Sequence, residues 1–133
     1  MKKFYSFIAA AILTVSLFTS CEKEDDRDAF VGTWNVNETW TISGWGSGTD
    51  NYTITISKSS TADNGIIVSS FGDIDVTINA TVSGSSVTIP SQTVYYDGDA
   101  VNVSGSGSLS GSTLIYNYNI IGLWFATCTA TKL

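Results

Sequence analysis

The sequence predicts an all-β domain, an eight-stranded antiparallel up-and-down β-barrel, and three observations support this. Alternate residues from 34 to 42 are mainly apolar, while the residues between them are polar, as in a strand with one buried face. The chain after residue 30 is rich in Ser, Thr, Gly and Asn, and shows no amphipathic helix. Eight such stretches follow one another through short turns, and closing them into a barrel removes exposed edges. A two-sheet sandwich is the structural alternative.

The first four strands are separated by glycine-containing turns. A glycine-rich loop at 43–50 carries Trp45, and Asp63-Asn64-Gly65 is a typical turn sequence. Gly72 ends the third strand, and the fourth has the most regular alternation in the chain. These four strands are expected at 30–42, 51–57, 66–71 and 73–82.

The last four strands follow the same pattern. Pro90 interrupts the fifth strand because it cannot donate a backbone hydrogen bond. Gly105 and Gly107 permit sharp bending in the sixth, and Gly122 marks the final turn. These strands are expected at 87–96, 100–109, 114–120 and 123–132.

Residues 1–20 have the features of a signal peptide. Lys2 and Lys3 precede an apolar run at 7–18, which is too short to span a bilayer comfortably. Leu17-Phe18-Thr19-Ser20-Cys21 resembles a bacterial lipobox, and this resemblance implies cleavage before Cys21 and attachment of lipid to it. The simpler alternative is an ordinary signal peptide followed by a chance cysteine. Acylation by two or more chains would anchor the protein stably to a membrane.

The segment 21–29 is expected to be an acidic tether, because a charge run of this kind stays solvated and disordered. The order Cys, any residue, Lys and two acids is similar to the export signal of Bacteroidota lipoproteins. That similarity implies a location on the outer face of the outer membrane. The alternative, a plain acidic linker, would say nothing about the location of the protein. Six basic and twelve acidic residues give a net charge of −6, which argues against nucleic acid as a partner.

At Gly32-Thr33-Trp34 the chain resembles the calycin superfamily, which includes the lipocalins. Members open their first strand with Gly-x-Trp, and a basic residue in the last strand packs across that Trp. Lys132 matches that residue and shares its parity with Cys128. Residues 30–133 are most similar to the short lipocalin-like lipoproteins of Bacteroidota. The resemblance implies a barrel whose closed end is plugged by Trp34.

The candidate ligand-binding residues follow from parity. Glu38 faces inward with Trp34, about 13 Å further along the strand, near the expected barrel mouth. A buried carboxylate is costly, so Glu38 is either a solvated rim residue or a hydrogen-bonding group for a ligand. Trp45 is expected to contact a ligand at the mouth or to cap the barrel. Four further aromatic residues are expected to point inward, where they either fill the core or contact an amphipathic or sugar-like ligand: Trp40, Tyr52, Tyr116 and Tyr118.

The chain contains no His, which excludes Ser-His and Cys-His catalysis and removes a usual zinc ligand. Its Asp pairs at 73/75 and 97/99 do not supply the oxygens that Ca²⁺ requires. Cys128 is expected to be a small buried hydrophobe, the alternative being a reactive thiol. We therefore expect no catalysis, no cofactor and no metal site.

The leading functional hypothesis is non-catalytic binding of a small apolar or amphipathic molecule in the barrel. The alternative is a protein-interaction module, such as an inhibitor or an accessory subunit of an outer-membrane surface complex. A cavity above about 300 Å³ would favour the ligand, and a filled interior would favour contacts made by the loops.

Overall fold

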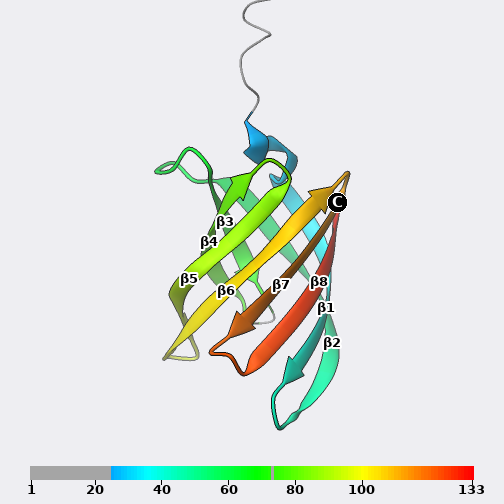
Figure 1. Ribbon diagram of the computed structural model, residues 1–133, viewed down its shortest axis with the longest axis vertical. Helices are drawn as coiled ribbons and strands as arrows, with labels where there is room; N and C mark the ends of the chain where they lie inside the picture. The colour runs from blue at the N-terminus through cyan, green and yellow to red at the C-terminus, as the bar shows by residue number, and fades with distance from the viewer. Residues whose placement is uncertain (1–24, 73) are drawn as a thin grey trace, which may run out of the picture.

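The computed structural model describes residues 25–72 and 74–133, which form a closed barrel of eight antiparallel strands (Figure 1). The strands follow one another in sequence order, and the first also pairs with the last, which confirms the predicted up-and-down barrel and excludes the sandwich. A short 3₁₀ helix, η1 (Asp26–Ala29), precedes them. The strands are β1 (Gly32–Ile42), β2 (Gly46–Lys58), β3 (Gly65–Phe71), β4 (Val76–Ser83), β5 (Ser86–Tyr96), β6 (Asp99–Ser110), β7 (Thr113–Ile120) and β8 (Trp124–Lys132).

The predicted signal peptide, the lipidation site Cys21 and the Lys and Glu at 23 and 24 lie outside the described residues. Within the described part of the chain, no helix combines the length and the apolar character needed to cross a membrane.

Two strands differ from the sequence-based expectation at their ends. The predicted loop 43–50 is only a tight turn, because β2 begins at Gly46 and pairs with β1 from there onward. Gly48 lies against the Trp40 ring, where an added Cβ would come within 2.5 Å of the ring. Gly48 therefore makes room for Trp40 within the sheet. The second difference is at the start of β4, which begins at Val76 rather than residue 73. Asp75, directly before it, adopts a turn conformation with φ 53°.

Strand β5 continues across Pro90 instead of breaking there. Its pairing with β6 shifts register between Ile89 and Gln92, so a bulge accommodates the proline.

One end of the barrel is closed by η1, by the turns that follow β2, β4 and β6, and by the C-terminus (Figure 1). Trp34 is fully buried here, and its Nε1 donates a hydrogen bond to Phe30 O at 2.9 Å. Lys132 Nζ lies 5.4 Å from the centroid of the Trp34 ring and donates to Ala29 O. The contact between Trp34 of the first strand and Lys132 of the last strand, which the resemblance to calycins implies, is therefore present.

The expectation of a disordered tether is wrong from Asp25 onward. The Arg27 guanidinium donates to three carbonyls around the β2–β3 turn, Ser59 O, Ala62 O and Gly65 O, at 3.1–3.2 Å. Arg27 also pairs with Asp25 at 2.7 Å, and its hydrogen bonds hold the pKa of Asp25 well below its usual range. These long-range bonds, which the charge run does not reveal, fasten the start of the described chain to the closed end.

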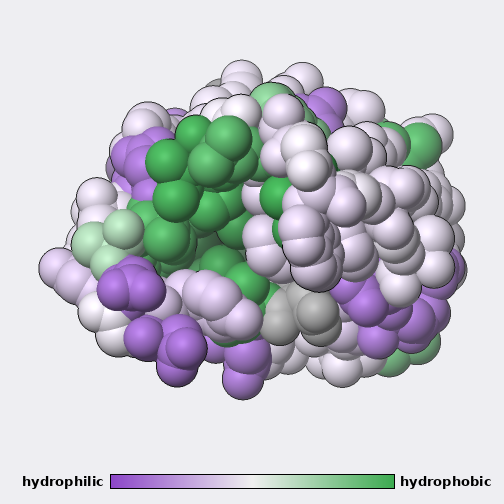
Figure 2. Space-filling view, turned by 90° about the horizontal axis from the view of Figure 1, so that it is seen from below, coloured by the Kyte–Doolittle hydropathy of each residue, from purple (hydrophilic) through white to green (hydrophobic). Residues whose placement is uncertain are grey.

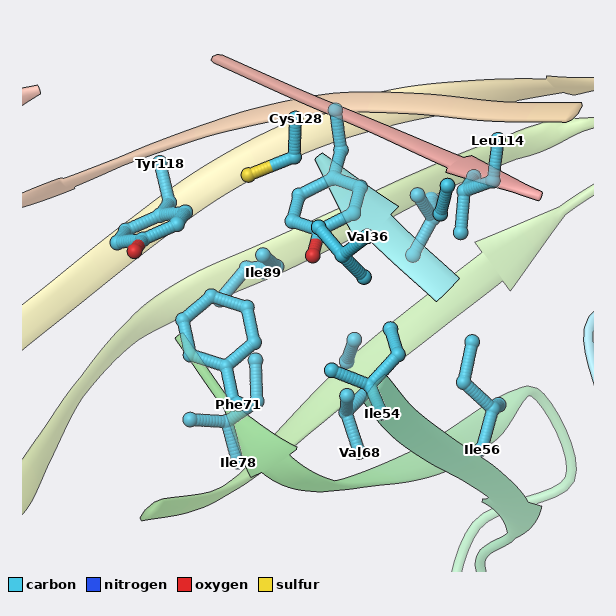
Figure 3. Packing of buried hydrophobic residues seen from close by; sticks show 14 of the residues in the cluster. Val36, Ile54, Ile56, Val68, Phe71, Ile78, Ile89, Leu114, Tyr118 and Cys128 are labelled. Carbon is cyan, nitrogen blue, oxygen red and sulfur yellow. The ribbon is translucent and has the colours of Figure 1, made fainter. Parts of the chain in front are cut away.

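The interior next to the closed end is filled with aliphatic and aromatic side chains. Figure 3 shows Ile54, Val68 and Leu114 among the side chains that converge from opposite walls. The cavity left among them measures only about 20 Å³, close to the volume of one water-sized sphere. This part of the barrel is therefore a packed core.

Candidate functional site

A buried polar cluster lies next to this core on the side of the open end. It is centred on Glu38, which is only 1% exposed. Tyr52 donates a hydrogen bond to Glu38 Oε1 at 2.7 Å, and Tyr118 donates to the same oxygen. Cys128 Sγ also donates to Oε1, at 3.5 Å. The interpretation of Glu38 as a solvated rim residue is therefore wrong, because β2, β7 and β8 place three donors around it.

Two glycines in β6 explain how the β7 tyrosines fit into the barrel. Gly105 pairs with Tyr118, and Gly107 pairs with Tyr116. A Cβ at Gly107 would lie 2.4 Å from the Tyr116 Cβ, and one at Gly105 would lie 2.9 Å from the Tyr118 Cβ. The two glycines therefore let β6 pack closely against the β7 tyrosines. From the sequence they were expected only to permit sharp bending of the strand.

The polar cluster is not fully satisfied. Among the described residues, three buried side-chain atoms have no hydrogen-bond partner. The Tyr116 hydroxyl is one of them, and it lies near Tyr52 and Cys128. A buried polar atom without a partner is unfavourable, and in a native protein it calls for an explanation. The three atoms are Glu38 Oε2, Tyr116 Oη and Trp124 Nε1.

Burial decides the protonation of the groups that surround Glu38. It raises the pKa of Tyr52, Tyr116 and Tyr118 well above the usual value for tyrosine. Burial, and secondly the Glu38 carboxylate, raises the pKa of Cys128 to about 12. All four groups are therefore protonated at neutral pH and can donate hydrogen bonds. A buried thiol of this kind is a poor nucleophile, so the prediction of Cys128 as a buried structural residue is confirmed.

The opposite end of the barrel carries an apolar hollow of about 220 Å³. The turns after β1, β3, β5 and β7 surround this open end, and Figure 2 shows hydrophobic atoms gathered in a depression there. All the residues around it are apolar or aromatic: Ile42, Ile74, Tyr96, Val101, Ile120, Ile121, Leu123 and Trp124. We call this feature the mouth hollow.

Three tryptophans form a row beside the mouth hollow. Trp40 stacks on Trp45 with ring centroids 6.3 Å apart, and its centroid lies 6.0 Å from that of Trp124. Trp40 Nε1 donates to Asp50 at 2.8 Å, which fixes the middle ring. Trp45 is 76% exposed, so it lies on the rim as the loop position predicted.

The predicted candidates thus divide into two groups. Glu38, Tyr52 and Tyr118 meet in the buried cluster with Tyr116 close by, whereas Trp40 and Trp45 lie toward the mouth. Sequence reasoning missed Cys128 as a donor to Glu38, although the two share inward parity. It also missed the mouth residues contributed by the β7–β8 turn, because Leu123, directly after Gly122, was assigned to the beginning of the last strand.

Among residues 25–72 and 74–133, no group of three or more His, Cys, Asp or Glu side chains is placed to hold a metal ion.

No family model matches the chain, and no curated protein matches it. Among solved structures, the chain is similar to a redesigned β-barrel, with a TM-score of 0.57 and 15% sequence identity. The alignment covers 82% of this chain and 96% of that one. At this identity the likeness shows the fold alone. The narrower resemblance to calycins rests on the Gly-x-Trp motif and on the contact between Trp34 and Lys132. The described part of the chain is shown to form an eight-stranded antiparallel β-barrel.

Proposed function

We propose that this protein binds a small apolar or amphipathic molecule without catalysis, and that the ligand occupies the mouth hollow. The observation that carries the proposal is a space of about 220 Å³ with an apolar lining at the open end. The deeper core leaves only about 20 Å³, so the mouth rather than the barrel centre offers room. At about 220 Å³ the hollow lies below the roughly 300 Å³ expected for a drug-sized ligand, so it suits only a smaller molecule.

A second surface groove, of about 260 Å³, lies beside the β2–β3 turn. Its lining mixes polar and apolar side chains, including Ser59, Asn79 and Pro90, and none of the buried unpaired atoms belongs to it. The mouth hollow is therefore the better ligand site.

The conformation of Ile121 supports a function at the mouth. Ile121 has φ 58° and is 59% exposed, yet it lines the hollow. A β-branched residue is unfavourable in this left-handed region, where Asn or Gly fits better. Strain that folding does not require is often found at binding sites. An apolar side chain held there at a cost to stability suits contact with an apolar ligand.

The proposal includes attachment to the outer membrane of a bacterium as a lipocalin-like lipoprotein, with lipid on Cys21 and the barrel outside the cell. Cys21 precedes Asp25 by four residues, which span at most about 14 Å. Because Asp25 is bound to Arg27 at the closed end, such an anchor would hold that end toward the membrane. The mouth hollow would then face outward, where a ligand arrives.

The substitution Ile121→Asn tests the site. We expect binding of 1-octanol, measured by isothermal titration calorimetry, to weaken by about fivefold or more, because apolar contact is lost. Ile115→Asn is the matched control, since Ile115 is also an exposed isoleucine but lies on the outer face of β7. Absence of octanol binding to the unaltered protein, or an equal loss in both variants, would contradict the proposal.

Native mass spectrometry of the protein from its own host provides an independent test. A discrete extra mass that disappears on denaturation is expected, and its value would give the size of the natural ligand. A bare polypeptide, together with absence of octanol binding, would refute a ligand-binding role.

A protein-interaction role is the second candidate, favoured by the filled barrel interior and by exposed apolar side chains at the open end. Trp45, Tyr95 and Leu123 are 76%, 73% and 55% exposed. A photo-crosslinking residue at position 45, in intact host cells, would give one discrete adduct if these side chains contact an outer-membrane protein. The same residue at position 115 is the control and should give none.

A further inference from the structure

The two oxygens of the Glu38 carboxyl group have different surroundings. Tyr52, Tyr118 and Cys128 all donate to Oε1. Oε2 is equally buried but has no donor among the described residues. Since a carboxylate offers acceptor sites on both oxygens, the group missing from this site is a hydrogen-bond donor.

The basic residues of the described chain do not supply that donor. Arg27 is bound to Asp25 and to carbonyls of the β2–β3 turn. Lys58 pairs with Asp25 and Asp28, and Lys132 lies over the Trp34 ring. All three cations are engaged at the closed end, so the described chain leaves Glu38 without a cationic partner.

One layer of side chains separates the mouth hollow from the polar cluster around Glu38. Tyr118 donates to Glu38, and Ile120, the next inward residue of β7, lines the hollow about 7 Å further along the strand. On β8, only the methyl group of Ala126 separates the inward positions of Cys128 and Trp124. Glu38 does not itself line the hollow, so a ligand in the hollow reaches Glu38 only past the side chains of this one layer, which include Ala126 and Trp40.

We propose that the mouth site selects an amphipathic primary amine, whose alkyl chain fills the mouth hollow while its ammonium group donates to Glu38 Oε2. This inference rests on the proposed function and adds the chemical class of the ligand. An ammonium group has three donors, so it can also donate to the oxygen of Tyr116, which is buried near the same cluster and has no partner in the described chain. Hydrogen bonds between an ammonium and a carboxylate are charge-assisted and stronger than neutral ones.

The first test compares three eight-carbon probes on the unaltered protein at pH 7 by isothermal titration calorimetry: octylamine, 1-octanol and octanoate. Octylamine is charged at this pH and should bind about tenfold or more tightly than octanol, with octanoate the weakest. Equal affinities, or tighter binding of octanoate, would overturn the amine inference while leaving the proposed function standing. Absence of binding by all three would overturn both.

Glu38→Gln tests the residue itself. The Gln carbonyl keeps an acceptor for the three donors, while its amide NH₂ replaces the free acceptor with a donor. The preference of octylamine over octanol should therefore fall to within about twofold. Asp97→Asn is the control, because it removes a negative charge from an exposed turn at the same end, where Asn tolerates the φ of 53°.

The control should keep the full preference for octylamine. An equal loss in Asp97→Asn would mean that general negative charge, and not Glu38, attracts the amine, which would overturn the inference. If Glu38→Gln does not fold, the three-probe comparison on the unaltered protein still decides the outcome.

Discussion

The two ends of the barrel use tryptophan in opposite ways. At the closed end Trp34 is fully buried and its indole N–H is satisfied by Phe30 O. At the open end Trp45 is 76% exposed, and Trp124 Nε1 is buried without a partner among the described residues. Among the described residues, the buried indole N–H is hydrogen-bonded at the closed end and unpaired at the open end. The closed end therefore contributes stability, and the open end keeps apolar surface that folding alone does not require.

The polar groups show the same contrast. The closed end joins distant parts of the chain, since Arg27 bonds to residues more than thirty positions away and Asp26 accepts from the Gly84 N–H. Toward the open end, one oxygen of Glu38 has no hydrogen-bond partner among residues 25–72 and 74–133, and Ile121 has an unfavourable φ. Buried polar groups are therefore better satisfied at the closed end than toward the open end, and substitutions at the two ends can test this difference.

The largest expected effect is that of Trp34→Ala. Truncating a fully buried Trp should lower the free energy of unfolding by about 3–5 kcal/mol, because the cavity cannot be refilled from the packed core. Trp45→Ala should cost less than about 1.5 kcal/mol, the scale of its stacking on Trp40. Denaturant-induced unfolding measures both. Similar losses in the two variants would break the contrast between the ends.

The second prediction concerns alkaline pH and the cluster between the ends. The unfolded Cys128 thiol has a pKa near 9.0, while burial raises its pKa to about 12 in the folded state. Between these values the folded state holds more protons, so stability is complete below pH 9 and falls as the pH rises toward 12. Cys128 alone should cost about 1.4 kcal/mol for each pH unit above 9, and the buried tyrosines act in the same direction above pH 10.

Chemical denaturation at a series of pH values measures this dependence. The control variant Cys128→Ala should lose stability less steeply between pH 9 and 10, because its unfolded state has no thiol to ionise there. Identical slopes in the two proteins would show that burial of the thiol does not contribute.

The smallest expected effect distinguishes strain from packing at the open end. Ile121→Asn should leave stability unchanged or raise it by up to about 1 kcal/mol, because Asn adopts the left-handed conformation more easily. Ile115→Asn, in the middle of β7, should lower stability by up to about 1 kcal/mol, since Asn is a poor strand residue. Thermal unfolding of both variants provides the comparison. A destabilised Ile121→Asn would mean that the mouth is packed for stability after all.

Much of the fold follows from local alternation in the sequence. The inward parity of Trp34, Glu38 and Tyr118 was predictable because side chains on a strand alternate faces, and short turns predicted the strand order. The contact between Trp34 and Lys132 was implied by the resemblance to calycins. Parity does not show how far a residue lies from solvent. Glu38 was correctly placed facing inward but wrongly assigned to the rim, because burial depends on donors from three other strands.

The glycines show where local reasoning fails. Gly48 and Gly107 weaken a strand by propensity, which predicted a loop in one case and a bend in the other. In the barrel they lie against the rings or backbones of Trp40 and Tyr116, where a side chain would clash. Their role depends on the residue opposite, and that residue is known only once the register is known.

By itself the sequence determined the strand faces and most of the turns, since these follow from periodicity and local chemistry, while the resemblance to calycins implied the tryptophan of the closed end. Only the tertiary structure decided that the core is packed, that Arg27 fastens the charged segment to the barrel, and that Glu38 Oε2 has no donor in the described part of the chain. The physical reason is that cavity volume and hydrogen-bond satisfaction are properties of side chains brought together from distant strands. No local pattern in one strand specifies them.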